Sequence, residues 1–314
     1  PPPGPPPPPA RPRRPPPRRP PAPPPRGAGP PRPSCRARVG PRAGGGAVRG
    51  GRVRAPAGQG GARAAAPRDG GREQLTWTEI RDALAQGWTS VIIPVGGTEQ
   101  SGPFIAVGKH NVRAAALSQR IAREVGHMLV APTIAYVPEG GTSPRTSHMR
   151  FAGTLSIPPA VFRELVTGAA ESLRVQGFRR IVVLGDHGGY QKDLRAVTQA
   201  LNRKWAGTGA HVVYLGAYYD VVAGSYADYL RRRGLGAAVG THADLSDTSL
   251  MLAIQPDMVR QDALRHAALP GPSQGVYGGD PRGASAALGQ VGADMQVAAA
   301  VRALQTDRNG PISP

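Results

Sequence analysis

The chain has 314 residues and a formal net charge of +19, and both its charge and its proline are concentrated at one end. Residues 1–75 hold 16 Arg against 2 acidic residues and 23 of the 36 Pro, whereas the other 239 residues hold 23 basic and 18 acidic groups. This distribution excludes a uniformly basic protein, and the balanced part is long enough for one domain with a buried core.

Residues 1–72 read as a tail made almost wholly of Pro, Arg, Gly and Ala. Because residues 1–69 contain no Lys, aromatic residue, Ile or Leu, the tail cannot bury enough apolar surface to offset its chain entropy, and we expect it to be disordered. An Arg-rich arm can bind nucleic acid, but these residue types are also those of GC-rich codons, and Arg outnumbers Lys 36 to 3. We therefore interpret much of the tail as the product of a mis-assigned gene start and expect no nucleic-acid partner.

Cysteine usage and hydropathy limit the compartment. Cys35, in the tail, is the sole cysteine, so the chain forms no internal disulfide and offers no thiolate ligand in its core. No apolar run reaches the ~18 residues of a membrane-spanning helix. We expect a cytoplasmic protein by default, or an exported one if the true N-terminus carried a signal peptide.

Residues 73–314 are predicted to form one domain in which strands alternate with helices. Thr76 and Glu79 make a capping-box pattern at the start of a helix that ends near Gln86. The later elements follow in chain order: strand 91–95, helix 112–125, strands 128–131 and 134–137, loop 138–153, helix 158–176, strand 181–184, helix 191–205, strand 211–215, and helices 222–232, 247–254 and 284–305. This alternation indicates an α/β fold with a mostly parallel sheet and helices on both faces.

Two of the predicted strands end in residues that suit a metal site. Glu99 follows strand 91–95 in a turn rich in Gly and Pro, and His187 follows strand 181–184 between glycines. Ligands of open α/β sheets bind outside the carboxyl ends of the strands. Carboxylate and imidazole are ligands of Zn²⁺, Mn²⁺ and Fe²⁺, so we expect Glu99 and His187 to bind a divalent metal. Asp186 either orients His187 or acts as a base, or it caps the following helix.

A third cluster, from His242 to Asp247, precedes a predicted helix. Asp247 is either the N-cap of that helix or a metal ligand, and His242 is a candidate general acid or base. His148 lies in the loop 138–153 and is a candidate for lining the substrate.

Four ordered blocks of this sequence resemble the creatininase (creatinine amidohydrolase) family. They are Ile93–Pro103, His148–Thr154, Gly177–Gly189, and His242 with Asp247–Ser249. The resemblance covers about residues 75–260. It implies a three-layer α/β/α sandwich and a homo-oligomer, in this family often a hexamer. It also implies one or two divalent ions that activate water to attack an amide carbon, usually of a cyclic amide or a formamide.

The chain departs from the family pattern at several site positions. The family usually has His at Ser101, Asp at His110, Glu at Asp247, and Asn-Gly at Gly185-Asp186. A carboxylate can bridge two cations, whereas a neutral imidazole ordinarily binds one. We therefore favour one ion per chain over two, of Zn, Mn or Fe. The expected ligands are Glu99, His110, His187 and Asp247.

The resemblance also implies roles for the neighbouring groups in cleaving a non-peptide C–N bond of a small-molecule amide. His242 or Asp186 would pass the proton to the leaving nitrogen. The backbone N–H groups of Gly188 and Gly189 would face the oxyanion, and Lys109 and His148 would face the substrate.

The main alternative is a catalytically retired binding or scaffold protein, because several family ligands are replaced. A metal-assisted lyase or isomerase could use the same ligands.

Overall fold

The computed structural model describes residues 72–308, so Cys35 and the predicted disordered tail, apart from Arg72, lie outside the described part. Four parallel strands form one sheet in the order β2-β1-β3-β4. Their bounds are β1 (Ser90–Val95), β2 (Met128–Val130), β3 (Arg180–Gly185) and β4 (His211–Tyr214).

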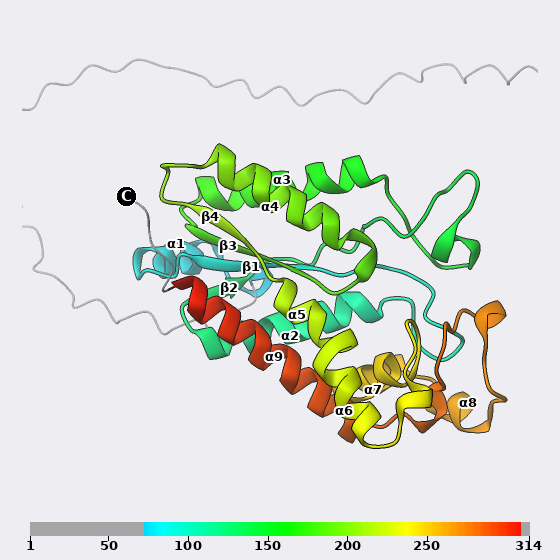
Figure 1. Ribbon diagram of the computed structural model, residues 1–314. Helices are drawn as coiled ribbons and strands as arrows, with labels where there is room; N and C mark the ends of the chain where they lie inside the picture. The colour runs from blue at the N-terminus through cyan, green and yellow to red at the C-terminus, as the bar shows by residue number, and fades with distance from the viewer. Residues whose placement is uncertain (1–71, 309–314) are drawn as a thin grey trace, which may run out of the picture. The chain divides into compact units, whose positions relative to one another are not determined.

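Helices cover both faces of this sheet, which gives the predicted three-layer sandwich (Figure 1). One face packs against α3 (Pro159–Val175) and α4 (Gln191–Lys204), and the other packs against α2 (Lys109–Val125), α5 (Gly216–Val221) and α9 (Ala286–Arg308). Successive strand residues point to opposite faces. Val91 and Ile93 therefore join the core under α3 and α4, while Ile92 joins the core under α2 and α9. Both faces of β1 are buried, which explains its continuous apolar run.

The remaining helices are α1 (Trp77–Ala85), α6 (Ala227–Arg232), α7 (Leu245–Ile254) and α8 (Gln261–His266). The predicted capping box of α1 is present, because Thr76 and Glu79 each accept a hydrogen bond from the other's backbone N–H. α6, α7 and α8 gather beyond the carboxyl ends of the strands (Figure 1). Within residues 72–308, no helix is both long and apolar enough to cross a membrane.

Three predicted elements differ from the structure. The expected strand 134–137 is wrong, since Ile134 makes only an isolated bridge to Val95. The expected helix 222–232 is the end of a longer segment, in which α5 and α6 are joined by a wider turn at Val222–Tyr226. α7 begins at Leu245 and not at Asp247, because Asp244 is the N-cap and accepts the Asp247 backbone N–H at 2.9 Å.

Candidate metal centre

The site lies where β1 and β3 end side by side. Val95 is paired with Gly185, so the residues that follow the two strands emerge next to each other. The buried Tyr190 ties these ends together: its hydroxyl donates to the Val95 carbonyl at 2.7 Å and accepts the backbone N–H of His187 at 3.1 Å. The sheet register therefore brings Glu99 and His187 together from positions 88 residues apart.

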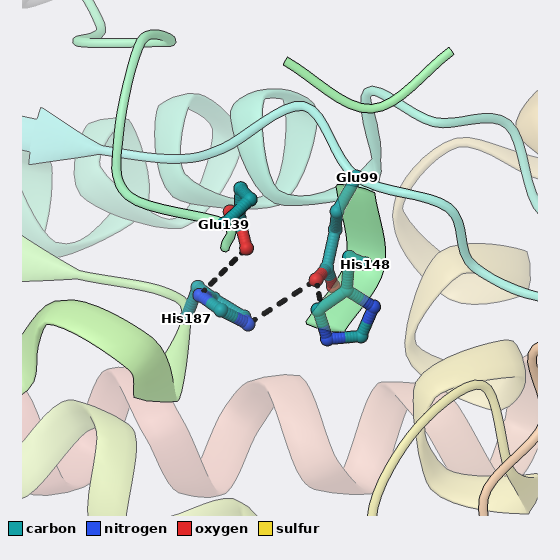
Figure 2. Close-up of side chains that lie close together, drawn as sticks. All are labelled: Glu99, Glu139, His148 and His187. Carbon is teal, nitrogen blue, oxygen red and sulfur yellow. Dashed lines mark ion pairs between the residues drawn. The ribbon is translucent and has the colours of Figure 1, made fainter. Parts of the chain in front are cut away.

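Four side chains converge at this point, as Figure 2 shows. Glu99 Oε2 lies 3.2 Å from His148 Nε2 and 3.2 Å from His187 Nε2, and His187 Nδ1 lies 3.4 Å from Glu139 Oε2. One ligand atom from each of these residues lies within 4.8 Å of all the others, an arrangement that could hold a metal ion.

Glu139 was not predicted from the sequence. It sits in the loop after Pro138 and is buried beside Gly97, which has a positive φ of 152° and no side chain to fill the space that Glu139 occupies. A Cβ at Gly97 would lie 2.5 Å from Glu139 Oε1. The glycine turn after β1 therefore admits a second carboxylate as well as presenting the first.

The two carboxyl groups differ in their ionisation. Burial opposes the charge on Glu99, but His187, Lys109 and His110 outweigh burial and hold the pKa of Glu99 well below its usual range. Burial and the neighbouring Glu99 raise the pKa of Glu139 to about 10. Within residues 72–308, both oxygens of Glu139 and Oε2 of Glu99 are buried and have no partner in hydrogen-bonding geometry.

His110 stands behind the cluster and bridges two carboxylates. Its Nε2 lies 2.8 Å from Glu99 Oε1, and its Nδ1 lies 2.7 Å from Asp186 Oδ2. Asp186 also accepts from Arg113 Nε at 2.8 Å and from the hydroxyl of Tyr218. Burial would raise the pKa of Asp186, but Arg113 and His110 lower it. Asp186 is thus an ionised carboxylate that contacts Arg113, Tyr218 and His110, and its contact with Nδ1 orients the His110 ring.

Asp247 is held by two buried cations. Its Oδ2 lies 2.7 Å from Lys109 Nζ and accepts the Ala243 backbone N–H at 3.0 Å, and its Oδ1 accepts from Arg113 at 3.0 Å. Lys109 Nζ also lies 3.5 Å from Glu99 Oε1. Burial alone would lower the pKa of Lys109, but the negative charges of Asp247 and Glu99 outweigh burial and raise this pKa.

His242 lies beside Glu99 and Gln100. Its Nδ1 lies 3.5 Å from Glu99 Oε1, and its Nε2 lies 2.9 Å from the Gln100 carbonyl oxygen and 3.1 Å from the Gln100 amide nitrogen. Burial and the nearby Lys109 lower the pKa of His242 to about 3, so this ring is neutral. Burial likewise lowers the pKa of His148.

A cavity of about 540 Å³ opens over these groups. Its lining includes Lys109, His110, His148, Asp186, His187, Gly188, His242 and Asp247, together with Tyr219 and Tyr277. The Gly189 backbone N–H, expected to face an oxyanion, lies 3.3 Å from His187 Nδ1.

The structure therefore gathers the predicted site residues in one place but divides them into two groups. Glu99, His148 and His187 belong to the four-residue cluster with Glu139. His110, Asp186 and Asp247 form an adjoining ion-pair network with Lys109 and Arg113.

The chain matches a known protein family over most of its described residues. The family model described as creatininase, creatinine amidohydrolase, matches residues 73–304. Creatinine amidohydrolase of Pseudomonas putida is 29% identical over 216 residues, which cover 66% of this chain and 81% of that protein. The mycofactocin precursor peptide peptidase of Mycolicibacterium smegmatis is 29% identical over 246 residues, 71% of this chain and 88% of that protein.

Solved structures agree in fold. A structure described as creatininase with Mn has a TM-score of 0.64 at 24% identity and covers 76% of this chain and 99% of its own. A Zn-Zn type structure of a creatininase mutant has a TM-score of 0.61 at 24% identity and covers 77% of this chain and 99% of its own. With a match from residue 73 to residue 304 and a shared fold, the chain belongs to the creatininase family.

Proposed function

We propose that this protein is a metal-dependent amidohydrolase that cleaves the C–N bond of a small cyclic amide or formamide. The observation that carries the proposal is the cluster of buried Glu99 and Glu139 with half-buried His148 and His187, of which the two histidines line the cavity. Hydrolysis of a C–N bond is also what the names of its relatives describe, for creatinine in one case and for a peptide in another.

The donor set fits a divalent ion. Among the residues that the structure describes, both oxygens of Glu139 are buried without a hydrogen-bond partner, an arrangement that is costly unless a cation satisfies them. Imidazole and carboxylate together suit Zn²⁺, Mn²⁺ or Fe²⁺. Mn and Zn are the metals in the descriptions of the related creatininase structures, which supports these choices.

The surrounding charges support one ion per chain. Glu99 turns Oε2 toward the cluster, while its Oε1 already faces His110 at 2.8 Å and Lys109 at 3.5 Å. A second cation bridging through Oε1 would have to displace the Lys109 ammonium, which is fully buried. Asp247 has both oxygens engaged by Lys109 and Arg113 and is not free to bind an ion.

A bound divalent ion would supply Lewis acidity, because it polarises a carbonyl group and makes water a nucleophile near neutral pH. The chain's own side chains would transfer the proton and position the neighbouring groups. His242 Nε2 lies 2.9 Å from the Gln100 carbonyl oxygen, which accepts, and 3.1 Å from the Gln100 amide nitrogen, which donates, so these contacts are compatible with either tautomer. The neutral ring can exchange a proton through Nδ1, which lies 3.5 Å from Glu99 Oε1. His242 therefore passes the proton to the leaving nitrogen, while Asp186 keeps His110 in place.

The cavity supports a small substrate. Its volume of about 540 Å³ lies within the range of sites for small molecules, roughly 300–1,000 Å³. Tyr219 and Tyr277 in its lining offer aromatic surface to a ring, and Gly188, also in the lining, follows His187 directly in the chain.

The test is metal content followed by a substrate panel. Full-length protein reconstituted with Zn²⁺ or Mn²⁺ is expected to hydrolyse at least one compound among cyclic amides, formamides and short peptides, and His187→Ala is expected to lose both metal and turnover. Metal binding without any turnover would favour the retired binding protein, and absence of metal binding would refute the proposed site. Light scattering on the same preparation tests the homo-oligomer that the family resemblance implies.

A further inference from the structure

Gln100, the residue after Glu99, is buried and its side-chain amide has a defined orientation. The backbone N–H of Gly102 donates to Gln100 Oε1 at 3.0 Å. Gly275 packs against the same oxygen so closely that a Cβ there would lie 1.9 Å from it. The carbonyl end of the amide is therefore fixed, and its NH₂ end points toward the histidines.

This orientation determines which nitrogen of His148 carries the proton. His148 Nδ1 lies 3.0 Å from Gln100 Nε2, and an amide nitrogen can only donate. His148 Nδ1 must accept, so the ring proton is on Nε2. That nitrogen lies 3.2 Å from Glu99 Oε2, and His148 lines the cavity.

His187 is not constrained in the same way. Its Nδ1 lies between a donor, the Gly189 backbone N–H at 3.3 Å, and a carboxyl oxygen of Glu139 at 3.4 Å. The first contact favours a proton on Nε2 and the second a proton on Nδ1, so together they do not fix the tautomer, and Nε2 of His187 can serve as a ligand. Of the two imidazoles in the cluster, His148 alone is fixed by a side-chain donor.

We infer that Gln100 is a positioning residue, which fixes His148 as an N–H donor to the substrate oxygen instead of a metal ligand. A nitrogen that carries a proton has no lone pair for a metal. Glu99, Glu139 and His187 then hold the ion, and three protein ligands with an open position are typical of catalytic zinc sites. A fixed N–H beside that position suits the charge that develops on a carbonyl oxygen during attack.

This inference rests on the proposed metal site and predicts the effect of one nearly isosteric change. In Gln100→Glu the group facing His148 becomes a carboxylate, which only accepts. His148 then carries its proton on Nδ1, and its Nε2 is free to bind the metal. The added negative charge would also attract a cation, so His148→Asn in both backgrounds is the matched control.

The first measurement uses metal-free, full-length protein labelled with ¹⁵N-histidine. Long-range ¹H–¹⁵N correlation at pH 8, with the His148 signals assigned through His148→Asn, is expected to show the proton on Nε2 in the wild type and on Nδ1 in Gln100→Glu. A wild-type His148 with its proton on Nδ1, or the same tautomer in both proteins, would overturn the inference. This readout does not depend on hydrolysis or on metal binding.

The second measurement is Zn²⁺ affinity by competition with a chelating dye. Gln100→Glu is expected to bind Zn²⁺ on the order of tenfold more tightly, the lower end of the effect of altering a group behind a ligand. That gain should vanish when His148→Asn is also present. If the gain persists in the double variant, charge alone explains it and the inference fails. If the wild type binds no Zn²⁺, the proposed function fails while the tautomer measurement still decides the role of Gln100.

Discussion

Replacing Lys109 by Met should destabilise the fold, because it removes the cation between two buried carboxylates. Lys109 Nζ lies 2.7 Å from Asp247 and 3.5 Å from Glu99, with no exposed side-chain area. At an effective dielectric constant of about 20 these separations correspond to attractions of about 6 and about 5 kcal/mol. Desolvation offsets much of this attraction, and removing one partner of a buried pair typically costs about 3–5 kcal/mol. For a domain of this size the melting temperature should fall by roughly 6–20 °C.

Urea and thermal denaturation of the metal-free protein, followed by far-UV circular dichroism, would measure this loss. Asp247→Asn is the matched single variant, and it leaves Arg113 paired with Asp186. The double variant removes both charges and should cost less than the sum of the two single variants, by about 2 kcal/mol or more, within the range measured for coupled neighbours. A loss below about 1 kcal/mol in Lys109→Met, or strict additivity, would contradict the buried ion-pair network.

Three further predictions concern the ion. Glu139→Gln should lower the amount of bound Zn²⁺, measured by elemental analysis, well below one equivalent per chain. The control Glu164→Gln, on the exposed side of α3, should leave the amount of bound Zn²⁺ unchanged. Equal Zn²⁺ content in the two variants would show that Glu139 does not bind the ion. Titration with excess Zn²⁺ should saturate at one tightly bound equivalent per chain, because the Lys109 ammonium lies beside Glu99 Oε1, where a second ion would have to bind. A second equivalent of similar affinity would show that an ion can displace this ammonium. Zn²⁺ at about 100 times its Kd should stabilise the fold by about 2.7 kcal/mol. Scanning calorimetry should then show a melting temperature roughly 5–11 °C higher, and no shift would mean that the folded protein does not bind the ion preferentially.

The sheet and its helices were predictable because their signals are local. The buried runs of β1 and β3 and the amphipathic pattern of α3 appear in the sequence without reference to any partner. The prediction of a strand at 134–137 was wrong. Its residues are apolar, as those of a strand are, but only Ile134 pairs with the sheet, and the chain leaves the sheet after it.

Glu99 and His187 were recognisable because each follows a strand directly and is flanked by glycine. Glu139 gives no comparable signal, since it sits in a long loop and reaches the site only through the open space beside Gly97. Asp244 and Asp247 both precede the apolar part of α7, and spacing alone does not show which of them caps it.

Lys109 and Arg113 illustrate a second limit. They are four residues apart on α2, and the sequence, from which Lys109 was expected to face the substrate, does not indicate that both are buried. Their burial depends on Asp186 and Asp247, which arrive from β3 and α7 far along the chain. Such a network follows from tertiary packing, which local patterns do not contain.

The pairing of β1 with β3 also fixes when the proposed metal centre can form during synthesis. A nascent chain that has left the ribosome only as far as α3 carries Glu99, Glu139 and His148, but neither His187 nor the β3 strand that aligns it. Because parallel strands joined through a long crossover pair only after that whole segment is available, the four side chains of the proposed centre can meet only after translation has passed residue 190. An ion at the proposed centre would therefore bind after the β1–β3 pair has formed, and not to the isolated loops that carry Glu99 and Glu139.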